Sequence, residues 1–118
     1  LGELIDICPT LAAVAGIPAP ALAQGRDLLD SSDPRKGGFS EMNIEGISAV
    51  MWRDKRHKLI RFQEAGSETV REEFYDISKD PGEWYNLDGR KETSLRQNLL
   101  RSRLLRKLSS LPRFNILP

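Results

Sequence analysis

The sequence contains a single cysteine, a single histidine and no long run of apolar residues. One cysteine, Cys8, excludes a framework of intrachain disulfides and leaves the redox compartment undetermined; we expect it to be a small apolar helix residue. No apolar run approaches the length of a membrane span, and residues 1–6 lack the basic start of a signal peptide. They also lack an initiator methionine. We therefore expect a fragment, an isolated domain or a truncated reading frame.

The 118 residues are 39% hydrophobic and 30% charged, which is typical of one modest globular domain with a small core. Charge is unevenly distributed: residues 1–89 carry ten lysines and arginines against sixteen acidic residues, whereas residues 90–118 carry eight against one. Such a basic tail can bind nucleic acid, a membrane surface or a sulfated glycan. It can equally be a solvated helix face whose arginines pair with the acidic body, and we favour this second interpretation.

One helix is predicted near each end of the chain. Residues 4–16 place Ile7, Leu11 and Val14 at helical spacing, with Asp6 as the cap and Gly16 as the stop. The polar loop 30–38 is then the expected internal boundary. Residues 93–111, before Pro112, form the second helix, and four of its leucines share one stripe that suits packing on a sheet: Leu100, Leu104, Leu108 and Leu111.

Between the helices, residues 38–43, 47–53, 57–62 and a run ending at Asp76 are predicted strands of a small antiparallel sheet. Residues 54–56 are the expected hairpin connection between the second and third strands. Apolar residues alternate onto both faces of these strands. The chain's own helices can cover one face, and the other face needs a covering that this chain lacks.

The segment 74–87, which we call the signature segment, combines a strand end, a proline turn and a second aromatic anchor. Asp80 precedes a proline, so its carboxylate is expected to accept hydrogen bonds from backbone amides of the turn. Four acidic residues in eleven positions also suit a metal site, but they match no calcium-loop spacing. The turn interpretation is favoured for these four carboxylates: Glu73, Asp76, Asp80 and Glu83.

Three residues are candidate ligand contacts. His57, on a predicted strand, can act as an acid, a base or an anion contact, although a half-exposed strand histidine without a catalytic partner is the simpler expectation. Glu41 and Asn43 offer a carboxylate and an amide at the end of a strand. No phosphate-binding glycine loop, paired-histidine zinc motif or nucleophile elbow occurs in the sequence.

Four segments of the sequence resemble motifs of the sulfatase family, within the alkaline-phosphatase-like hydrolases, and they follow the family's order. The signature segment reads aromatic-Tyr-Asp-aliphatic, then Asp-Pro-x-Glu, then Asn-Leu. Residues 5–18 are similar to an Asp-aliphatic-x-Pro-Thr-Leu helix ending in Ala-Gly-aliphatic-Pro. Residues 25–29 resemble a Gly-Arg-Ser-Leu turn, with Asp27 where Ser is usual, and residues 53–60 resemble the strand pair Arg-x-x-x-x-Lys-aromatic/aliphatic-Ile. Together the four segments span residues 5–87.

The resemblance implies an α+β fold in which a small antiparallel sheet of about four strands packs against a C-terminal helix. The N-terminal helix would belong to the edge of a missing α/β catalytic domain. Residues 1–36 are then expected to be the end of the catalytic domain, and residues 37–118 the C-terminal subdomain.

The family hydrolyses sulfate esters with a formylglycine, made in a Cys/Ser-x-Pro-x-Arg motif, and with a calcium held by Asp and Asn residues. The resemblance implies that both lie upstream of the four matching segments. Cys8 is not part of such a motif, since Thr10 and Ala12 stand two and four residues after it, where the motif needs Pro and Arg. We therefore expect no catalytic or metal-binding residue in this chain, and no activity from the chain alone.

The implied partner is the missing catalytic domain or another subunit, and a sulfated substrate would meet Glu41, Asn43 or His57. We expect no membrane span, and we do not expect nucleic acid as a partner. Two alternatives stay open: a non-functional truncated gene product, and a free-standing polyanion-binding module whose basic helix carries Arg96, Arg101, Arg103, Arg106 and Lys107. Neither the sulfated substrate nor the compartment follows from the sequence.

Overall fold

The computed structural model describes residues 1–32 and 34–111, so Pro112, before which the last helix was expected to end, lies outside the described residues. The chain divides into two compact units, Leu1–Gly38 and Phe39–Pro118. Within the described ranges, no helix has the length and apolar character that crossing a membrane requires.

The first unit is built on a short 3₁₀ helix, η1 (Leu4–Asp6), that continues into α1 (Ile7–Val14). Gly16, with φ of +68°, ends the helix in a Schellman motif, because its amide bonds to the carbonyl of Ala13 and the amide of Ile17 bonds to that of Ala12. The predicted helix and its glycine stop are thus confirmed, with a 3₁₀ first turn.

Asp6 organises the first unit. Its side chain is fully buried and accepts hydrogen bonds from the amide of Glu3 at 2.7 Å, from the amide of Arg26 at 2.9 Å and from the guanidinium of Arg35. Burial opposes ionisation, but these donors outweigh it and hold the pKa of the carboxyl below its usual value. The sequence predicts only a local cap, so the contacts to Arg26 and Arg35 correct that interpretation.

The turn at residues 25–28 closes onto η1 and α1 through Thr10 and Gly25. The Thr10 hydroxyl donates to the carbonyl of Asp6 at 2.6 Å and accepts from the amide of Leu28 at 2.9 Å. A Cβ at Gly25 would lie 2.0 Å from the carbonyl oxygen of Ile5, so only glycine fits there. Asp6 and Thr10 therefore hold the turn at Gly25 and Arg26 through hydrogen bonds to its backbone, and we call this arrangement the Asp6 clamp.

The apolar stripe of α1 faces outward. Ile7, Leu11 and Val14 are 48%, 62% and 66% exposed, whereas the buried helix residues are the smaller Pro9 and Ala12. The outward surface is a shallow apolar groove, which we call the α1 groove, and it is lined by Leu4, Ile7, Cys8, Leu11, Ala12, Ala15, Ile17, Pro18 and Pro20.

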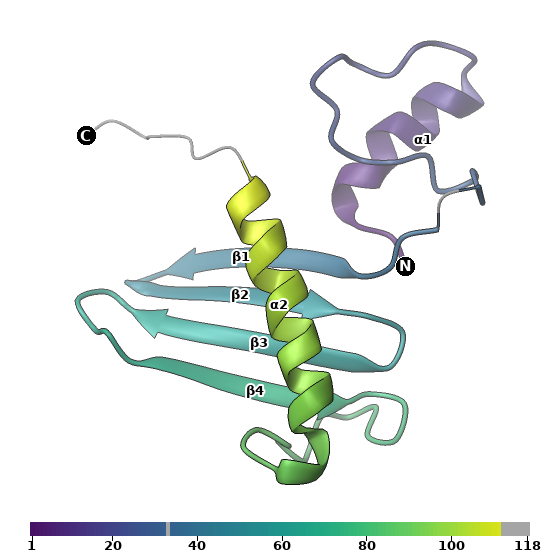
Figure 1. Cartoon of the computed structure of the whole chain (residues 1–118). Helices are drawn as coiled ribbons and strands as arrows, with labels where there is room; N and C mark the ends of the chain where they lie inside the picture. Colours follow the sequence, from purple (N-terminus) through teal and green to yellow (C-terminus); the bar gives the residue numbers. More distant parts are fainter. Residues whose placement is uncertain (33, 112–118) are drawn as a thin grey trace. The chain divides into compact units, whose positions relative to one another are not determined.

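The second unit contains four strands in sequence order: β1 (Gly38–Ile44), β2 (Ile47–Arg53), β3 (His57–Glu64) and β4 (Val70–Asp76) (Figure 1). The β2–β3 and β3–β4 pairs are antiparallel. The predicted strands are confirmed, with β1 and β3 extending slightly further. The turn 54–56 is closed by a hydrogen bond from the amide of Asp54 to the carbonyl of His57 at 2.9 Å.

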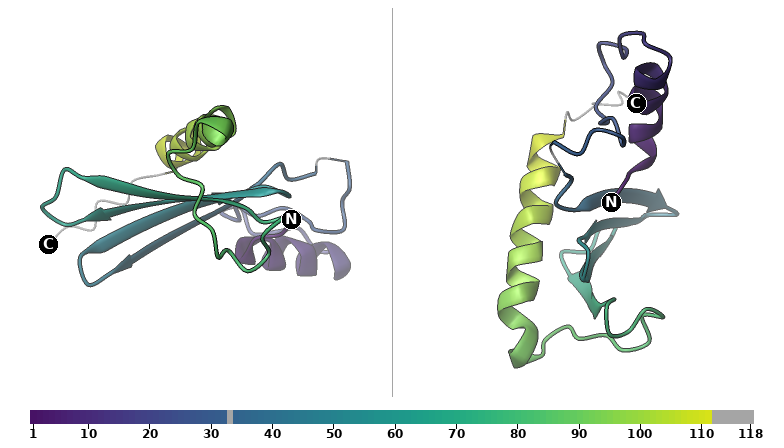
Figure 2. Two further views of the ribbon diagram at one scale, coloured as in Figure 1. Left: turned by 90° about the horizontal axis from the view of Figure 1, so that it is seen from below. Right: turned by 90° about the vertical axis from the view of Figure 1, so that its right-hand side faces the viewer.

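Helix α2 (Ser94–Ser110) follows a 3₁₀ turn, η2 (Lys91–Thr93), and lies along one face of the sheet (Figure 2). Fully buried side chains of the described residues form the core: Leu59, Phe74, Leu100 and Leu104. Partly buried residues pack around them: Phe39, Val50, Trp52 and Leu87. The predicted α+β arrangement of sheet and C-terminal helix is therefore confirmed, and Leu100 and Leu104 of the predicted leucine stripe lie in the core. Leu108 is only partly buried, and Leu111 follows the end of α2.

The opposite face of the sheet, which we call the open face, is also apolar. Side chains alternate along a strand, so Met51, Ile60 and Phe62 point away from α2, because Trp52 and Leu59 point toward it. All three are partly exposed, and Ile47 on the same face is 40% exposed. Both faces of the sheet thus carry apolar weight, as the alternation predicts.

Replacing Gly25 by alanine should break the clamp of the first unit, because the added methyl group meets backbone and not a movable side chain. We expect fast hydrogen exchange at the amides of Arg26 and Leu28, which otherwise bond to Asp6 and Thr10. Gly16→Ala is the matched control: apart from neighbouring positions in the chain, no atom of the described residues would lie within 4 Å of an added Cβ, so the positive φ alone should cost about 1–2 kcal/mol. Equal amide protection in both variants would contradict the clamp.

Candidate functional site

The signature segment begins where Asp76 ends β4. Its carboxylate accepts a hydrogen bond from the Ser78 hydroxyl at 2.6 Å and one from the Arg56 guanidinium at 3.0 Å. Burial opposes ionisation, but Arg56 and Ser78 outweigh it and hold the pKa of Asp76 well below its usual range. This carboxylate therefore stays charged and bound to its own chain.

The proline turn that follows is fixed by Asp80 and Glu83. Asp80 accepts a hydrogen bond from the amide of Tyr85 at 2.9 Å, as predicted for a turn carboxylate. Glu83, which has a positive φ of 55°, accepts from the ammonium of Lys58 on β3 at 2.6 Å. A non-glycine residue in this conformation costs free energy, and the ion pair to Lys58 helps to hold it there.

Asn86 and Leu87 return the chain to the end of β4. The Asn86 side-chain oxygen accepts from the amides of Phe74 and Asp88, and the Leu87 amide donates to the carbonyl of Phe74 at 2.8 Å. Leu87 also packs on the core. The polar positions that define the signature therefore bond within their own chain, which supports the turn interpretation of its acidic residues.

Trp84 and Tyr85 do not form the second aromatic anchor that was expected within the signature segment, because neither side chain is buried. Trp84 is 82% exposed and Tyr85 is 70% exposed. The Trp84 indole lies so close to Gly82 that a Cβ there would come within 2.1 Å of its Nε1. Asn86 and Leu87 provide the anchor instead, because one closes the backbone turn and the other reaches the core.

His57 lies at the start of β3. It is buried, so the prediction of a half-exposed histidine is wrong. It is 6% exposed and stacks on Phe74 with ring centroids 5.5 Å apart. Its Nδ1 lies 3.9 Å from the Asp54 carboxylate and its Nε2 lies 3.9 Å from that of Asp76. Desolvation lowers the pKa of His57 below its ordinary value, although both carboxylates oppose that shift.

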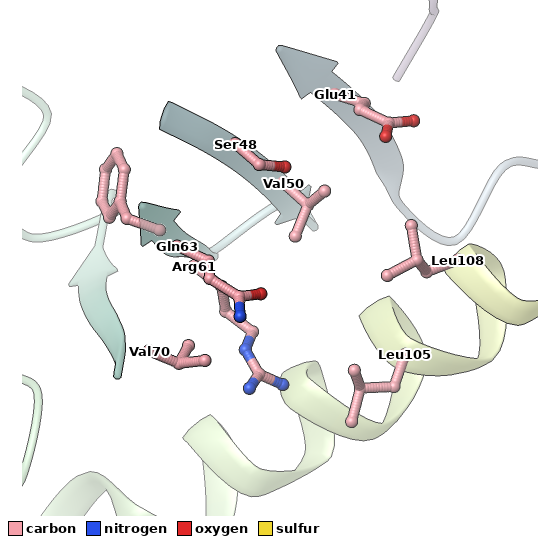
Figure 3. A pocket seen from close by; sticks show the side chains of 9 residues that line it. Glu41, Ser48, Val50, Arg61, Gln63, Val70, Leu105 and Leu108 are labelled. Carbon is pink, nitrogen blue, oxygen red and sulfur yellow. The ribbon is translucent and has the colours of Figure 1, made fainter. Parts of the chain in front are cut away.

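Glu41 and Asn43 lie on the exposed edge strand β1. Glu41 lines a groove of about 220 Å³ between the sheet and α2, together with Val50, Arg61 and Leu105 (Figure 3). Arg61 lies four positions after His57 on β3, which is roughly 13 Å along a strand. The three predicted site residues are therefore not gathered into one site: Glu41 borders the groove and His57 is buried near the far end of β3.

Glu72 of β4 is a partly buried polar centre that the sequence does not reveal. It accepts from Gln97 at 3.0 Å and from the Arg101 guanidinium at 2.5 Å, both on α2, and it pairs with Arg61 of β3 at 3.1 Å. Burial opposes ionisation, but these partners hold the pKa of Glu72 below its usual value. The i, i+4 spacing of Gln97 and Arg101 is the available signal, but it does not identify the strand residue that they meet.

The basic helix is partly neutralised by the sheet. Arg101 pairs with Glu72, and Arg103 approaches Asp54 at 3.7 Å. These pairs confirm that arginines of the tail bind the acidic body, which is the favoured interpretation of the charge pattern. They also leave fewer free cations on α2 for a polyanion.

No protein-family model matches the sequence, and no curated protein matches it. Solved structures do match. The protein BT4656, determined in complex with its substrate D-glucosamine-2-N,6-O-disulfate, matches with a TM-score of 0.76 and 26% identity over 88% of this chain. The phosphonate monoester hydrolase of Agrobacterium radiobacter matches with a TM-score of 0.68 and 21% identity over 88% of this chain. This chain spans only 23% and 24% of their respective lengths.

Glu72→Gln should loosen α2 from the sheet, because Arg61 and Arg101 would lose a partly buried carboxylate partner. The Arg101 side chain is 34% exposed and screened by solvent, so we expect a loss of about 1–3 kcal/mol in the free energy of unfolding by urea. Glu64→Gln is the matched control, because its pair with Arg71 is exposed and should be worth at most about 1 kcal/mol. Similar losses in the two variants would contradict the central role of Glu72.

Proposed function

The chain resembles the sulfatase family of alkaline-phosphatase-like hydrolases, to which both matching structures belong, and we propose that it is the C-terminal part of a sulfuric ester hydrolase. In this role it completes the fold and helps to shape the substrate cleft. The catalytic centre would lie in residues outside this chain.

One observation carries the proposal: 88% of this chain matches 23% of BT4656 at 26% identity. Because the match includes most of this chain but less than a quarter of BT4656, it supports the proposal that this chain corresponds to one part of such an enzyme. The four sequence motifs add support, because they occur in the family's order, and three of them form the Asp6 clamp and the signature turn.

The family's calcium and formylglycine do not fit the residues present. Asp6 and Asp76, which are buried, and Glu72, which is partly buried, are each paired with an arginine. Within the residues that the structure describes, no three potential metal ligands gather. Cys8 lies in the α1 groove and outside the modification motif. We therefore assign no catalytic step to this chain.

The partner that we propose is the catalytic domain of the same hydrolase, or a subunit that supplies it. Two surfaces suit such docking: the α1 groove, with Leu11 62% exposed, and the open face of the sheet, with Ile47 40% exposed. Contiguous apolar surface of this kind marks interaction sites in soluble proteins. Burying it would return about 25 cal/mol per Å² of apolar area.

The substrate that we propose is a sulfated sugar, the class that BT4656 binds. Glu41 and Asn43 are exposed on β1, where a carboxylate and an amide can bind sugar hydroxyl groups. His57 is buried, so it can contact a substrate only if the residues that cover it move. We retain all three residues as proposed substrate contacts, although only His57 needs a conformational change to reach the substrate.

The isolated chain should not hydrolyse an aryl sulfate, with or without calcium, because its sequence has no Cys/Ser-x-Pro-x-Arg motif in which a formylglycine nucleophile could be made. The complete reading frame should encode a Cys/Ser-x-Pro-x-Arg motif upstream of Leu1, and its product should turn over the same substrate. Measuring both proteins side by side tests the proposal. Calcium-dependent turnover by the chain alone, or an upstream frame without the motif, would overturn it.

Leu11→Glu should leave the isolated chain folded but impair docking, since Leu11 is already 62% exposed. In the complete protein we expect a loss of soluble yield and of sulfatase activity by about tenfold or more, as a charge buried without a partner costs several kcal/mol. Leu95→Glu on α2 is the control, because Leu95 is 86% exposed and lies outside both docking surfaces. Unchanged yield and activity for Leu11→Glu would remove the α1 groove from the interface.

A further inference from the structure

The groove between the sheet and α2, which we call the sheet groove, has apolar walls. Val50 of β2 and Val70 of β4 form the wall on the side of the sheet, and Leu105 and Leu108 form the wall on the side of α2. The volume of about 220 Å³ is smaller than the roughly 300–1,000 Å³ of pockets for drug-sized ligands. The sheet groove therefore suits a ligand of about the size of one sugar ring, with its C–H groups against the apolar walls.

Four polar side chains also line the sheet groove: Glu41 of β1, Ser48 of β2, and Arg61 and Gln63 of β3. Arg61 extends from β3 toward α2, and Glu41 lies on the opposite side of the groove (Figure 3). Strand β2 lies between β1 and β3, so the backbones of these two strands are about 10 Å apart. The sheet groove thus offers a cation on one side and a carboxylate on the other.

The positive charge of Arg61 is only partly neutralised. Arg61 approaches Glu72 through Nε at 3.1 Å, and the same carboxylate accepts a hydrogen bond from Arg101 at 2.5 Å. Two guanidinium groups share one carboxylate, so two positive charges and one negative charge leave a net charge of +1. Asp88 accepts from Gln97 and acts on Arg101. The Arg61 guanidinium therefore has positive charge and N–H donors to offer an anion in the groove.

We propose that the sheet groove binds a sulfated amino sugar, with the sulfate on Arg61 and the amino group on Glu41. A guanidinium binds an oxyanion through parallel N–H donors, and a carboxylate accepts a charge-assisted hydrogen bond from an ammonium group. Ser48 and Gln63 provide hydrogen-bonding groups for the sugar hydroxyls. The choice of a sugar rests on the proposed function, which this inference deepens by placing Glu41 in a defined pocket.

The test is an NMR titration of the 118-residue chain with D-glucosamine 6-sulfate. We expect saturable shifts at the amides of Ser48, Val50 and Gln63, which line the sheet groove. Glucosamine without sulfate, glucose 6-sulfate and inorganic sulfate should each bind about tenfold more weakly or worse, because each lacks a group for one side of the groove. The absence of saturable shifts at millimolar ligand, or equal binding of all four compounds, would overturn the proposal.

Variants then assign the two charged contacts. Arg61→Gln should weaken binding of glucosamine 6-sulfate by about tenfold or more. Arg71→Gln is the matched control, because it removes the same charge from β4 opposite Phe62, on the open face of the sheet. Glu41→Gln should remove the preference for glucosamine 6-sulfate over glucose 6-sulfate. Equal weakening by the two arginine variants would contradict the site.

Because Arg61 also pairs with Glu72, a second variant keeps the test independent of that pair. Leu105→Glu adds a negative charge to the wall formed by α2, and Leu105 is already 44% exposed, so we expect this variant to fold and to repel the sulfate. Unchanged binding in Leu105→Glu would overturn the site. The proposed function is tested separately by turnover in the complete protein, so a failure of one is distinguishable from a failure of the other.

Discussion

The second unit depends on one constraint: a single helix must cover one face of a four-stranded sheet. Leu59, Phe74, Leu100 and Leu104 are fully buried in that contact. Burial of each is worth roughly 1.5–3 kcal/mol, so together they match the entire net stability of a small domain. The signature turn, through Leu87, and the stack on His57, through Phe74, both rest on this core. Their geometry therefore holds only while α2 stays docked.

In each unit a carboxylate with little exposed surface joins segments that are distant in sequence. Asp6 binds Arg26 and Arg35, which lie 20 and 29 residues away, and Glu72 binds Arg101, 29 residues away. A buried acid of this kind adds little net stability compared with a well-packed apolar residue, but removing its partners is costly. Such residues therefore act mainly by specifying which segments meet. The larger apolar side chains of the first unit lie outward on α1. The hydrogen bonds of Asp6 therefore do most to fix how the segments of this unit are arranged.

The sequence predicts the elements of this fold well and its long-range polar contacts poorly. Period-2 alternation locates the strands and the leucine stripe locates α2, because both patterns are local consequences of a two-layer core. For Asp6 the sequence predicts only a cap, and for His57 a half-exposed ring, because the true environments depend on partners supplied by tertiary structure. Of the candidate site, the turn chemistry of Asp80 is predictable from its proline. The burial of His57 between two carboxylates is not, since it needs the register that sets His57 opposite Asp76.

The first unit shows how polar and apolar surfaces divide their roles. Its buried side contains Asp6, Pro9 and Ala12, while Leu11 and Val14 remain exposed. A helix that had to fold alone would bury its larger residues, because they return more free energy per residue. The polar clamp can instead set the backbone shape before any docking, with the apolar groove left to supply affinity. Preorganisation of this kind lowers the entropy lost on association. If the chain docks on a catalytic domain as proposed, the Asp6 clamp fixes the backbone of the first unit and the α1 groove makes the apolar contact. The family-like motifs in residues 5–29 then encode the clamp.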